Sequence, residues 1–295
     1  MDSQNVYEEI TEKMINILEG GNCPWVKPWK DGPSSFNLPE SFKTRKLYRG
    51  INSWILWWAP YRSNLWGTFK QLLEAGYPVR KGEKATKIIF WKILEKESVG
   101  ENGKKTKDKI PLLKTYSVFN VDQTEGFPEV VQGDLIQREV KEKIEDCEKL
   151  ISSFPLGMPE IQYAPGKAFY SPSRDVISIP SPADYENQEY YYHTLFHESI
   201  HATGHKERLN RESLLASNFF GDDIYSQEEL VAEMGASFLD AFSGIGQKTI
   251  ENSAAYLRGW INALRGDSKL IIRAAAQAQK ATDYLMNVKF EEKDE

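Results

Sequence analysis

The alternation of apolar and polar positions predicts a mixed α/β region in the first 128 residues. Apolar residues three and four positions apart over residues 5–19 are typical of an amphipathic helix, which Gly20 and Gly21 end. The polar run 95–109, rich in Lys and Gly, is expected to be an exposed and mobile hairpin loop. The predicted elements of this region are helices over residues 5–19, 52–58 and 67–75, and strands over residues 86–94 and 112–121.

The pattern weakens near residues 125–135, where we place a linker, and the chain beyond it is predicted to be mostly helical. The expected helices cover residues 136–153, 187–204, 226–243, 248–265 and 268–287, and the expected strands cover residues 160–164, 167–170 and 175–180. This order predicts an α+β protein of two domains. A small α/β domain, residues 1–128, precedes a mostly helical domain, residues 129–295.

Charge and aromatic content separate the same two regions. Residues 25–92 hold 13 Lys and Arg against 4 Asp and Glu, whereas from residue 131 onward 17 basic residues face 27 acidic ones. Seven of the eight tryptophans lie between Trp25 and Trp91. The two cysteines form no CxxC motif, and no apolar stretch is long enough to span a bilayer. We therefore expect a cytoplasmic protein with no membrane partner, whose two regions have different functions.

All four histidines lie within thirteen positions, and two of them frame an HExxH motif. Residues four apart share one face of a helix, so His197 and His201 can hold one metal ion. Glu198 lies one step round the helix, where a carboxylate can act as a general base instead of a ligand. This division of roles is typical of a zinc hydrolase, so the expected cofactor is one divalent ion, Zn²⁺.

A third ligand would leave one coordination position open for water. Glu229 and Glu233 are four apart on the helix predicted over residues 226–243, so both can face inward. Small residues follow Glu233, and they would let this helix approach the HExxH helix closely. We predict Glu233 as the ligand and Glu229 as an outer or alternate ligand.

Three further side chains near the motif have competing interpretations. His205 is a rival ligand, but Gly204 is expected to end the helix before it. His193, one turn before the motif, is interpreted as a packing or hydrogen-bonding residue. Tyr225 could donate to an oxyanion, although a tyrosine at the start of a helix is more often structural. A metal-bound or metal-free helix whose peptidase activity is vestigial stays an alternative for the whole site.

The basic aromatic region has two interpretations. Large aromatics are usually core, and we expect this for Trp54, Ile55, Leu56, Trp66 and Phe69. The remaining aromatics, interleaved with basic residues, are typical of a surface that stacks unpaired bases and follows a phosphate backbone. A salt-dependent contact with protein or lipid is the alternative. The predicted contacts with single-stranded DNA are Trp25, Trp29, Lys43, Arg45, Lys46, Tyr48, Arg49, Lys70, Arg80, Lys81 and Lys84.

Short motifs follow one another along nearly the whole chain. The first half contains Pro24-Trp25-x-x-Pro28-Trp29, Tyr48-Arg49-Gly50-Ile51-Asn52, Trp66-Gly67-Thr68-Phe69-Lys70-Gln71, Val79-Arg80-Lys81-Gly82-Glu83-Lys84 and Val118-Phe119-Asn120-Val121-x-Gln123. The second half contains His197-Glu198-x-x-His201-x-Thr203-Gly204-His205, Arg208-Leu209, Tyr225-x-x-Glu228-Glu229-Leu230-Val231-Ala232-Glu233 and the stretch Ala274–Tyr284. In this order the motifs resemble those of the ArdC-type antirestriction proteins, which conjugative plasmids and related mobile elements carry.

The resemblance implies an N-terminal domain that binds single-stranded DNA, joined to a zincin-like metallopeptidase domain. It implies that the protein shields incoming single-stranded DNA from host restriction. A protein substrate is a candidate second partner, because the family does not settle whether antirestriction requires proteolysis or which protein would be cut. The metal roles fall to His197 and His201 and the base role to Glu198, while Glu233 fits the pattern of the third ligand in gluzincin-like enzymes. Two alternatives stay open: a DNA-binding protein with a catalytically silent metal site, and a DNA-dependent protease that acts on DNA-bound proteins.

Overall fold

The computed structural model describes residues 3–22, 38–99, 105–128, 140–216, 223–245 and 254–288, with side chains for a slightly smaller set. The chain separates into two compact units. The first contains Met1–Ile10, Leu38–Tyr48 and Asn52–Val130, and the second contains Thr11–Asn37, Arg49–Ile51 and Val131–Glu295. Helices and small sheets together make an α+β fold, as predicted. In the described part of the chain, no helix is long and apolar enough to cross a membrane.

The first unit is built on a four-stranded sheet in the order β1-β2-β4-β3. Its strands are β1 (Glu40–Ser41), β2 (Leu65–Gly67), β3 (Thr86–Val99) and β4 (Lys105–Asn120), and its helices are α2 (Ile51–Trp57) and α3 (Phe69–Glu74). Helix α1 (Ser3–Glu19) contributes its first residues to this unit and the rest to the second. The sequence predicted these helices and the two long strands, but not β1 or β2.

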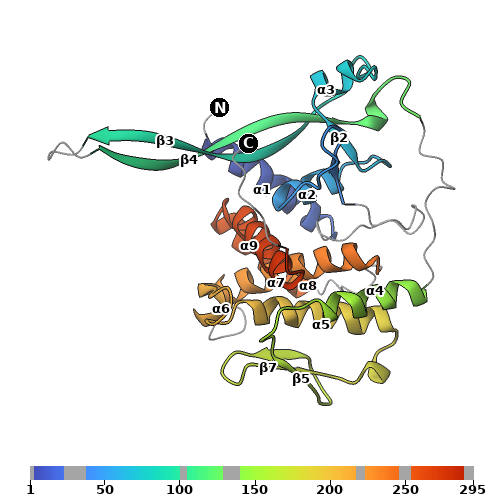
Figure 1. Ribbon diagram of the computed structural model, residues 1–295, viewed down its shortest axis with the longest axis vertical. Helices are drawn as coiled ribbons and strands as arrows, with labels where there is room; N and C mark the ends of the chain where they lie inside the picture. Colours follow the sequence, from blue (N-terminus) through green and yellow to red (C-terminus); the bar gives the residue numbers. More distant parts are fainter. Residues whose placement is uncertain are drawn as a thin grey trace. The chain divides into compact units, whose positions relative to one another are not determined.

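The predicted hairpin loop over residues 95–109 is wrong, because most of it is strand. Strands β3 and β4 form one long antiparallel hairpin (Figure 1). The register continues through Glu95↔Lys109, Lys96↔Asp108 and Glu97↔Lys107 to Val99↔Lys105. The backbone hydrogen bonds of an antiparallel pair form without an apolar side-chain pattern. The polar composition of the run therefore hid a strand.

The core of the first unit lies between the sheet and α2. Leu56, Ala59, Trp66, Ile88 and Val118 form its buried cluster, and Tyr48 and Tyr61 pack against it. The outer strand β3 is tied to α2 by a buried side chain. The amide of Asn52 donates to the carbonyl of Ile89 at 2.6 Å and accepts from its N–H at 2.9 Å. This pairing satisfies backbone groups that an edge strand would otherwise leave open.

The tryptophans of the described part are largely core, as predicted for two of them. Trp54 and Trp66 are buried, and Trp57 is buried as well. Ile55 and Leu56 are also buried, whereas the prediction for Phe69 is wrong. Its side chain is 51% exposed, because the six-residue helix α3 buries Leu72 and presents Phe69 outward. Trp25 and Trp29 lie outside the described residues.

The second unit packs helices on one side of a small sheet. Its helices are α4 (Val140–Ser152), α5 (Gln188–Thr203), α6 (Glu212–Ala216), α7 (Asp223–Ser243), α8 (Ala254–Gly266) and α9 (Leu270–Leu285). Its strands are β5 (Glu160–Tyr163), β6 (Phe169–Ser171) and β7 (Val176–Ile179), in the order β5-β7-β6. Helix α7 packs on α5 and α9, and the sheet covers the other side of α5 (Figure 1). The sequence predicted these elements except α6.

Candidate metal centre

Helix α5 presents the HExxH residues from two consecutive turns. Its first turn is capped by Asn187, whose side chain accepts from the N–H of Tyr190 at 3.0 Å. The helix ends at Thr203, as the glycine at position 204 predicted. A Cβ atom on Gly204 would lie 2.9 Å from the guanidinium of Arg211. The absence of a Cβ atom leaves room for the guanidinium of Arg211 against the end of α5.

Helix α7 brings the carboxylates to α5. A Cβ atom on Gly235 would lie 2.7 Å from the side chain of Ile200, closer than real contacts allow. The absence of that atom lets the two helices approach, as the run of small residues predicted. Ala236 and Ser237, the next two residues of α7, are fully buried. Glu228, Glu229 and Glu233 consequently all face α5.

Three side chains converge on one point: His197, His201 and Glu229. The Nε2 atoms of the two histidines are 3.1 Å apart, and the carboxylate oxygens of Glu229 lie 3.4 Å from Nε2 of His201 and 3.6 Å from Nε2 of His197. Ligands of a tetrahedral zinc ion at about 2.0–2.1 Å are separated by about 3.3 Å. The spacing of these atoms and their chemistry therefore fit one divalent metal ion.

The two glutamates exchange the positions that the sequence predicted for them. Glu229 faces both Nε2 atoms, whereas Glu233 lies 3.3 Å from Nδ1 of His197, on the far side of the ring. Glu228 takes the corresponding place at His201, 3.2 Å from its Nδ1. A carboxylate behind each ligating histidine fixes the ring orientation and raises its basicity. The geometry thus favours Glu229 over Glu233 as the third ligand.

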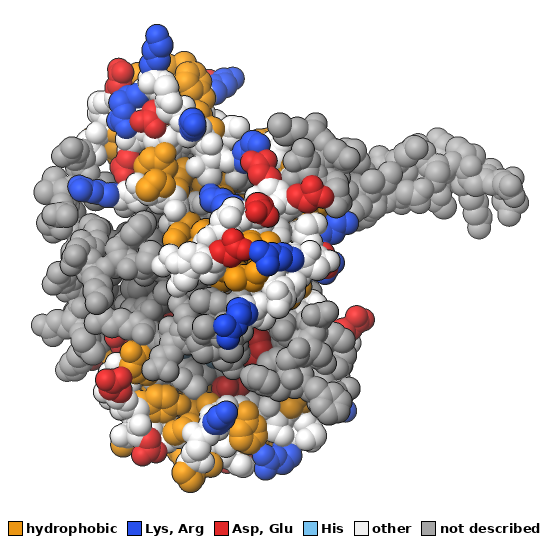
Figure 2. Space-filling view, turned by 180° about the vertical axis from the view of Figure 1, so that it is seen from behind, with side chains coloured by type: hydrophobic (Ala, Val, Ile, Leu, Met, Phe, Trp, Pro, Cys, Tyr) orange, Lys and Arg blue, Asp and Glu red, His pale blue; other side chains and the backbone are white. Residues whose placement is uncertain are grey.

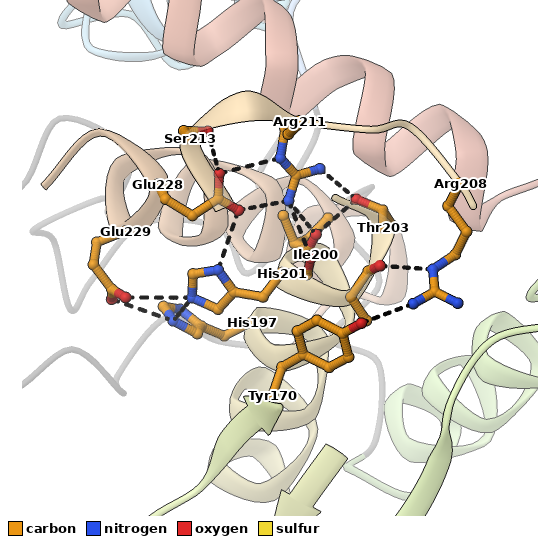
Figure 3. A network of polar contacts seen from close by, with 11 residues as sticks. Tyr170, His197, Ile200, His201, Thr203, Arg208, Arg211, Ser213, Glu228 and Glu229 are labelled. Carbon is orange, nitrogen blue, oxygen red and sulfur yellow. Dashed lines mark hydrogen bonds and ion pairs between the residues drawn. The ribbon is translucent and has the colours of Figure 1, made fainter. Parts of the chain in front are cut away.

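A buried arginine network fixes Glu228, and the sequence did not reveal it. Arg211 donates to Glu228 at 2.6 Å, to the hydroxyl of Thr203 at 2.6 Å and to the carbonyl of Ile200 at 2.6 Å (Figure 3). The hydroxyl of Ser213 donates to the second carboxylate oxygen at 2.5 Å. Arg211 is only 4% exposed. The loop after α5 therefore supports the metal centre from behind.

The protonation of these groups follows from their packing. Burial disfavours protonated His201, but the carboxylates of Glu228 and Glu229 outweigh it and raise its pKa to about 9. Burial opposes ionisation of Glu228, but hydrogen bonding from His201 and the charge of Arg211 outweigh it and hold its pKa at about 2. The pKa of Glu229 is lowered against burial by hydrogen bonds from His197 and His201. The lowered pKa values keep the carboxylates of Glu228 and Glu229 ionised beside the two imidazoles.

Glu198 differs from the carboxylates on α7. It is 7% exposed, and no described residue donates a hydrogen bond to its carboxylate. It is therefore available for a proton from a bound molecule. His205 is buried and its Nδ1 accepts from the N–H of Glu207 at 3.3 Å, so it stands apart from the three converging residues. Tyr225 lies inside α7, and its side chain is outside the described set.

A second polar chain runs from His197 into the interior of the unit. Nδ1 of His193 lies 2.7 Å from Asp240, and its Nε2 lies 3.9 Å from Glu233. Burial opposes protonation of His193, but the charge of Asp240 outweighs it and raises the pKa of the imidazole. The hydrogen-bonding interpretation of His193 agrees with this contact. No signal in the sequence singled out Asp240, which is fully buried three turns beyond Glu229.

Arg208 ties the loop after α5 to the sheet. It donates to the hydroxyl of Tyr170 at 3.0 Å (Figure 3). It also donates to the carbonyl of Ala202 at 2.7 Å and to Asp175 at 3.0 Å. Asp175 precedes β7 and Tyr170 lies in β6, so the contact spans both strands. The sheet is thereby fixed against α5, the helix that carries the HExxH residues.

The predicted DNA contacts are dispersed, and several already have protein partners. Arg80 donates to the carbonyls of Asp122 at 2.6 Å and Thr124 at 2.9 Å, and to Glu83 at 2.9 Å. Tyr48 packs against the core, and burial raises its pKa to about 12. The ion-paired residues are Arg45 with Glu40, Arg49 with Asp283 and Lys70 with Glu74.

Lys43, Lys46, Lys81 and Lys84 are the remaining predicted basic contacts in the described part, and all four are exposed. Figure 2 draws one face of the molecule, and on its described surface Lys and Arg are interspersed with Asp and Glu. The excess of basic residues in the sequence does not gather there into one field. The DNA contacts therefore stay predictions.

Comparison with known proteins matches each unit to a family. Residues 4–119 match the N-terminal domain of the anti-restriction factor ArdC, and residues 148–277 match a zincin-like metallopeptidase. The chain is 30% identical over 289 residues to the uncharacterized protein y4eC of Sinorhizobium fredii, covering 95% of this chain and 91% of that one. It is also 33% identical over 295 residues to a DNA primase TraC of Escherichia coli, covering 95% of this chain but only 27% of TraC.

Two solved structures resemble the whole chain. The metal-free ArdC protein of plasmid R388 matches with a TM-score of 0.76 and 34% identity, covering 97% of both chains. The Mn(II)-bound form matches with a TM-score of 0.73 and 35% identity, covering 97% of this chain and 99% of that one. These likenesses extend over both units and agree with the two family matches. The chain belongs to the ArdC family of antirestriction proteins, with an ArdC N-terminal domain followed by a zincin-like metallopeptidase domain.

Proposed function

We propose that this protein binds single-stranded DNA, protects it from restriction during transfer of a mobile element, and hydrolyses peptide bonds at its metal centre. The observation that carries the hydrolytic part is the convergence of His197, His201 and Glu229 beside a buried Glu198 with no donor among the described residues. Membership of the ArdC family supports the antirestriction part. The domains that carry these roles are proposed as residues 1–128 and 129–295.

The chain's own residues set up the proposed reaction. Zinc, the ion we propose for this set of ligands, would polarise the scissile carbonyl and make water nucleophilic when bound. Glu233 and Glu228 hold the two imidazoles so that their Nε2 atoms face Glu229. Glu198 takes the proton of the attacking water and delivers it to the leaving amine. Tyr225 stays a candidate donor to the developing oxyanion.

A substitution at Glu198 tests the hydrolytic part. Glu198→Gln should lower cleavage of a quenched fluorescent peptide library by about 10²- to 10⁴-fold, because it removes the general base. Metal content and DNA affinity should not change. Glu207→Gln, an exposed carboxylate close in sequence, serves as the matched control and should cleave like the wild type. Cleavage by Glu198→Gln at the wild-type rate would exclude Glu198 as the base. No cleavage by the metal-loaded wild type would leave a DNA-binding protein with a silent metal site.

Titration with labelled oligonucleotides over a salt series tests the DNA part. We expect tighter binding to the single strand than to the duplex, and weaker binding as salt rises, because basic contacts release counterions. Equal affinity for the single-stranded and the duplex oligonucleotide would contradict the proposed shielding of single-stranded DNA.

The presence of both domain types in one chain favours a second candidate function, cleavage of proteins attached to DNA. A protein crosslinked to a single-stranded oligonucleotide should then be cut faster than the same protein alone. Equal rates for the two substrates would exclude this function.

A further inference from the structure

The buried tryptophans direct attention to other aromatic side chains. Trp54, Trp57 and Trp66 cannot stack on a base, since each is at most 4% exposed. Large apolar side chains that do reach solvent in the described part of the first unit are Leu47, Phe69, Leu73, Phe90 and Tyr116. Phe90 and Tyr116 differ from the others because they lie on two paired strands and contact each other.

Phe90 and Tyr116 share one face of the β3–β4 hairpin. Tyr116 pairs with Ile88 in the register, so Phe90, two positions along β3, lies on the same face. Their ring centroids are 5.4 Å apart with the ring planes at 82°. The rings are 46% and 44% exposed. Together they present an aromatic surface of two rings to solvent.

The core anchors this aromatic pair at one end. Ile88 and Val118 lie on the same face of the hairpin and are buried in the hydrophobic cluster of the first unit. The pair therefore continues the buried face of the sheet into solvent, on strands whose backbone is fixed by pairing. A rigid, partly exposed aromatic surface loses little conformational entropy when a planar ligand stacks on it.

The charge on this face of the β3–β4 hairpin favours a negatively charged ligand. Lys114 is exposed and lies directly across from Phe90 in the register. Among the described side chains of the face (Thr86, Ile88, Phe90, Lys114, Tyr116 and Val118), none is a carboxylate. An aromatic pair beside an unopposed cation is the arrangement that binds unpaired bases and their phosphates. It fits a polyanion better than a second copy of this acidic chain, whose net charge is −6.

We infer that Phe90 and Tyr116 form a stacking surface for the bases of single-stranded DNA, with Lys114 on the adjoining phosphate. This assignment rests on the proposed binding of single-stranded DNA. It adds to the predicted contacts two aromatic side chains of the β3–β4 hairpin that the sequence did not single out.

Leucine substitutions test the inference, because leucine retains apolar bulk but removes the ring. Binding of the full chain to an oligothymidine labelled with fluorescein is measured by anisotropy over a salt series. Phe90→Leu and Tyr116→Leu should each weaken binding by at least about 5-fold, and together by about 30-fold. The slope of log affinity against log salt should not change in these variants. Lys114→Gln should instead reduce the slope by about 0.7, the loss of one phosphate contact.

Phe69→Leu is the matched control, because Phe69 is 51% exposed in the same unit and also has an edge contact with a ring, that of Phe119. It should bind like the wild type, and all variants should keep the wild-type melting temperature. Wild-type affinity in the Phe90/Tyr116 double variant would overturn the inference while leaving the proposed function intact. Absence of binding by the wild type would overturn the proposed function itself. A double variant that changes only the sedimentation of the protein would identify the face as a contact between copies and overturn the inference.

Discussion

The metal centre and the basic aromatic region differ in how their residues are distributed along the chain. His197 and His201 are separated by one helical turn, and Glu229 comes from a single neighbouring helix. The basic residues of the N-terminal region are spread over loops, strands and the short helix α3, and three of them, Arg80, Arg45 and Lys70, form ion pairs within the protein. Chemistry set by helical spacing is visible in a sequence. A surface made by tertiary structure is not, because the sequence does not show which cations are already paired.

Removal of Arg211 should have the largest effect on stability. It tests whether the protein without metal holds the residues of the metal centre in place. Arg211→Ala leaves Glu228 buried without its cation, so we expect a loss of about 3–5 kcal/mol in the free energy of unfolding of the metal-free protein. Urea denaturation measures it. Arg273→Ala, which breaks an exposed pair with Asp267, should cost about 0–1 kcal/mol. Equal urea midpoints for the two variants would show that the network does not support the site.

Substitutions of Glu229 and Glu233 on α7 should affect metal affinity to different degrees. Glu233→Gln weakens the support of His197 and should lower metal affinity by about 10- to 100-fold, the usual effect of an outer hydrogen-bond partner. Glu229→Gln removes a ligand and should lower it further. Competition with a chromogenic chelator gives both affinities. The reverse order would restore Glu233 as the ligand, as the sequence predicted.

Asp175 should show a smaller effect with a defined pH dependence. Hydrogen bonding from Arg208 lowers the pKa of Asp175, so the ionised carboxylate stabilises the fold above its unfolded pKa. This stability is lost as pH falls through the lowered value. Asp175→Asn should cost about 1 kcal/mol at neutral pH and nothing in strong acid. Asn accepts the left-handed backbone at this position, where φ is 50°, so the change isolates the charge. An equal loss at both pH values would contradict the linkage.

The smallest expected effect compares two neighbouring basic residues of the N-terminal region. Lys81 is exposed, so Lys81→Gln should reduce the salt slope of single-strand binding by about 0.7. Arg80 already donates to two carbonyls and to Glu83, so Arg80→Gln should leave the slope unchanged and lower the melting temperature. If the salt slope changed with Arg80→Gln but not with Lys81→Gln, existing hydrogen bonds within the protein would not predict which basic residues contact DNA.

Periodicity and spacing explain which elements could be predicted. The helices of the second unit and the histidine pair follow from repeats of three and four positions. Strand β2 is too short to give an alternating pattern, and the charged ends of β3 and β4 resemble a loop until their register is known. The choice between Glu229 and Glu233 depends on which ring nitrogen each one faces, which spacing along α7 does not determine. Arg211 acts through a loop that folds back, and no local pattern encodes such a contact.

A crystal structure of the metal-loaded protein would identify the third ligand. Crystals of the zinc-loaded protein, measured on both sides of the zinc absorption edge, give an anomalous peak at the metal. We expect one peak at about 2.0–2.2 Å from Nε2 of His197, Nε2 of His201 and a carboxylate oxygen of Glu229. Glu233 should lie behind His197 without touching the ion. A peak ligated by Glu233, or no peak between the two histidines, would contradict the proposed centre.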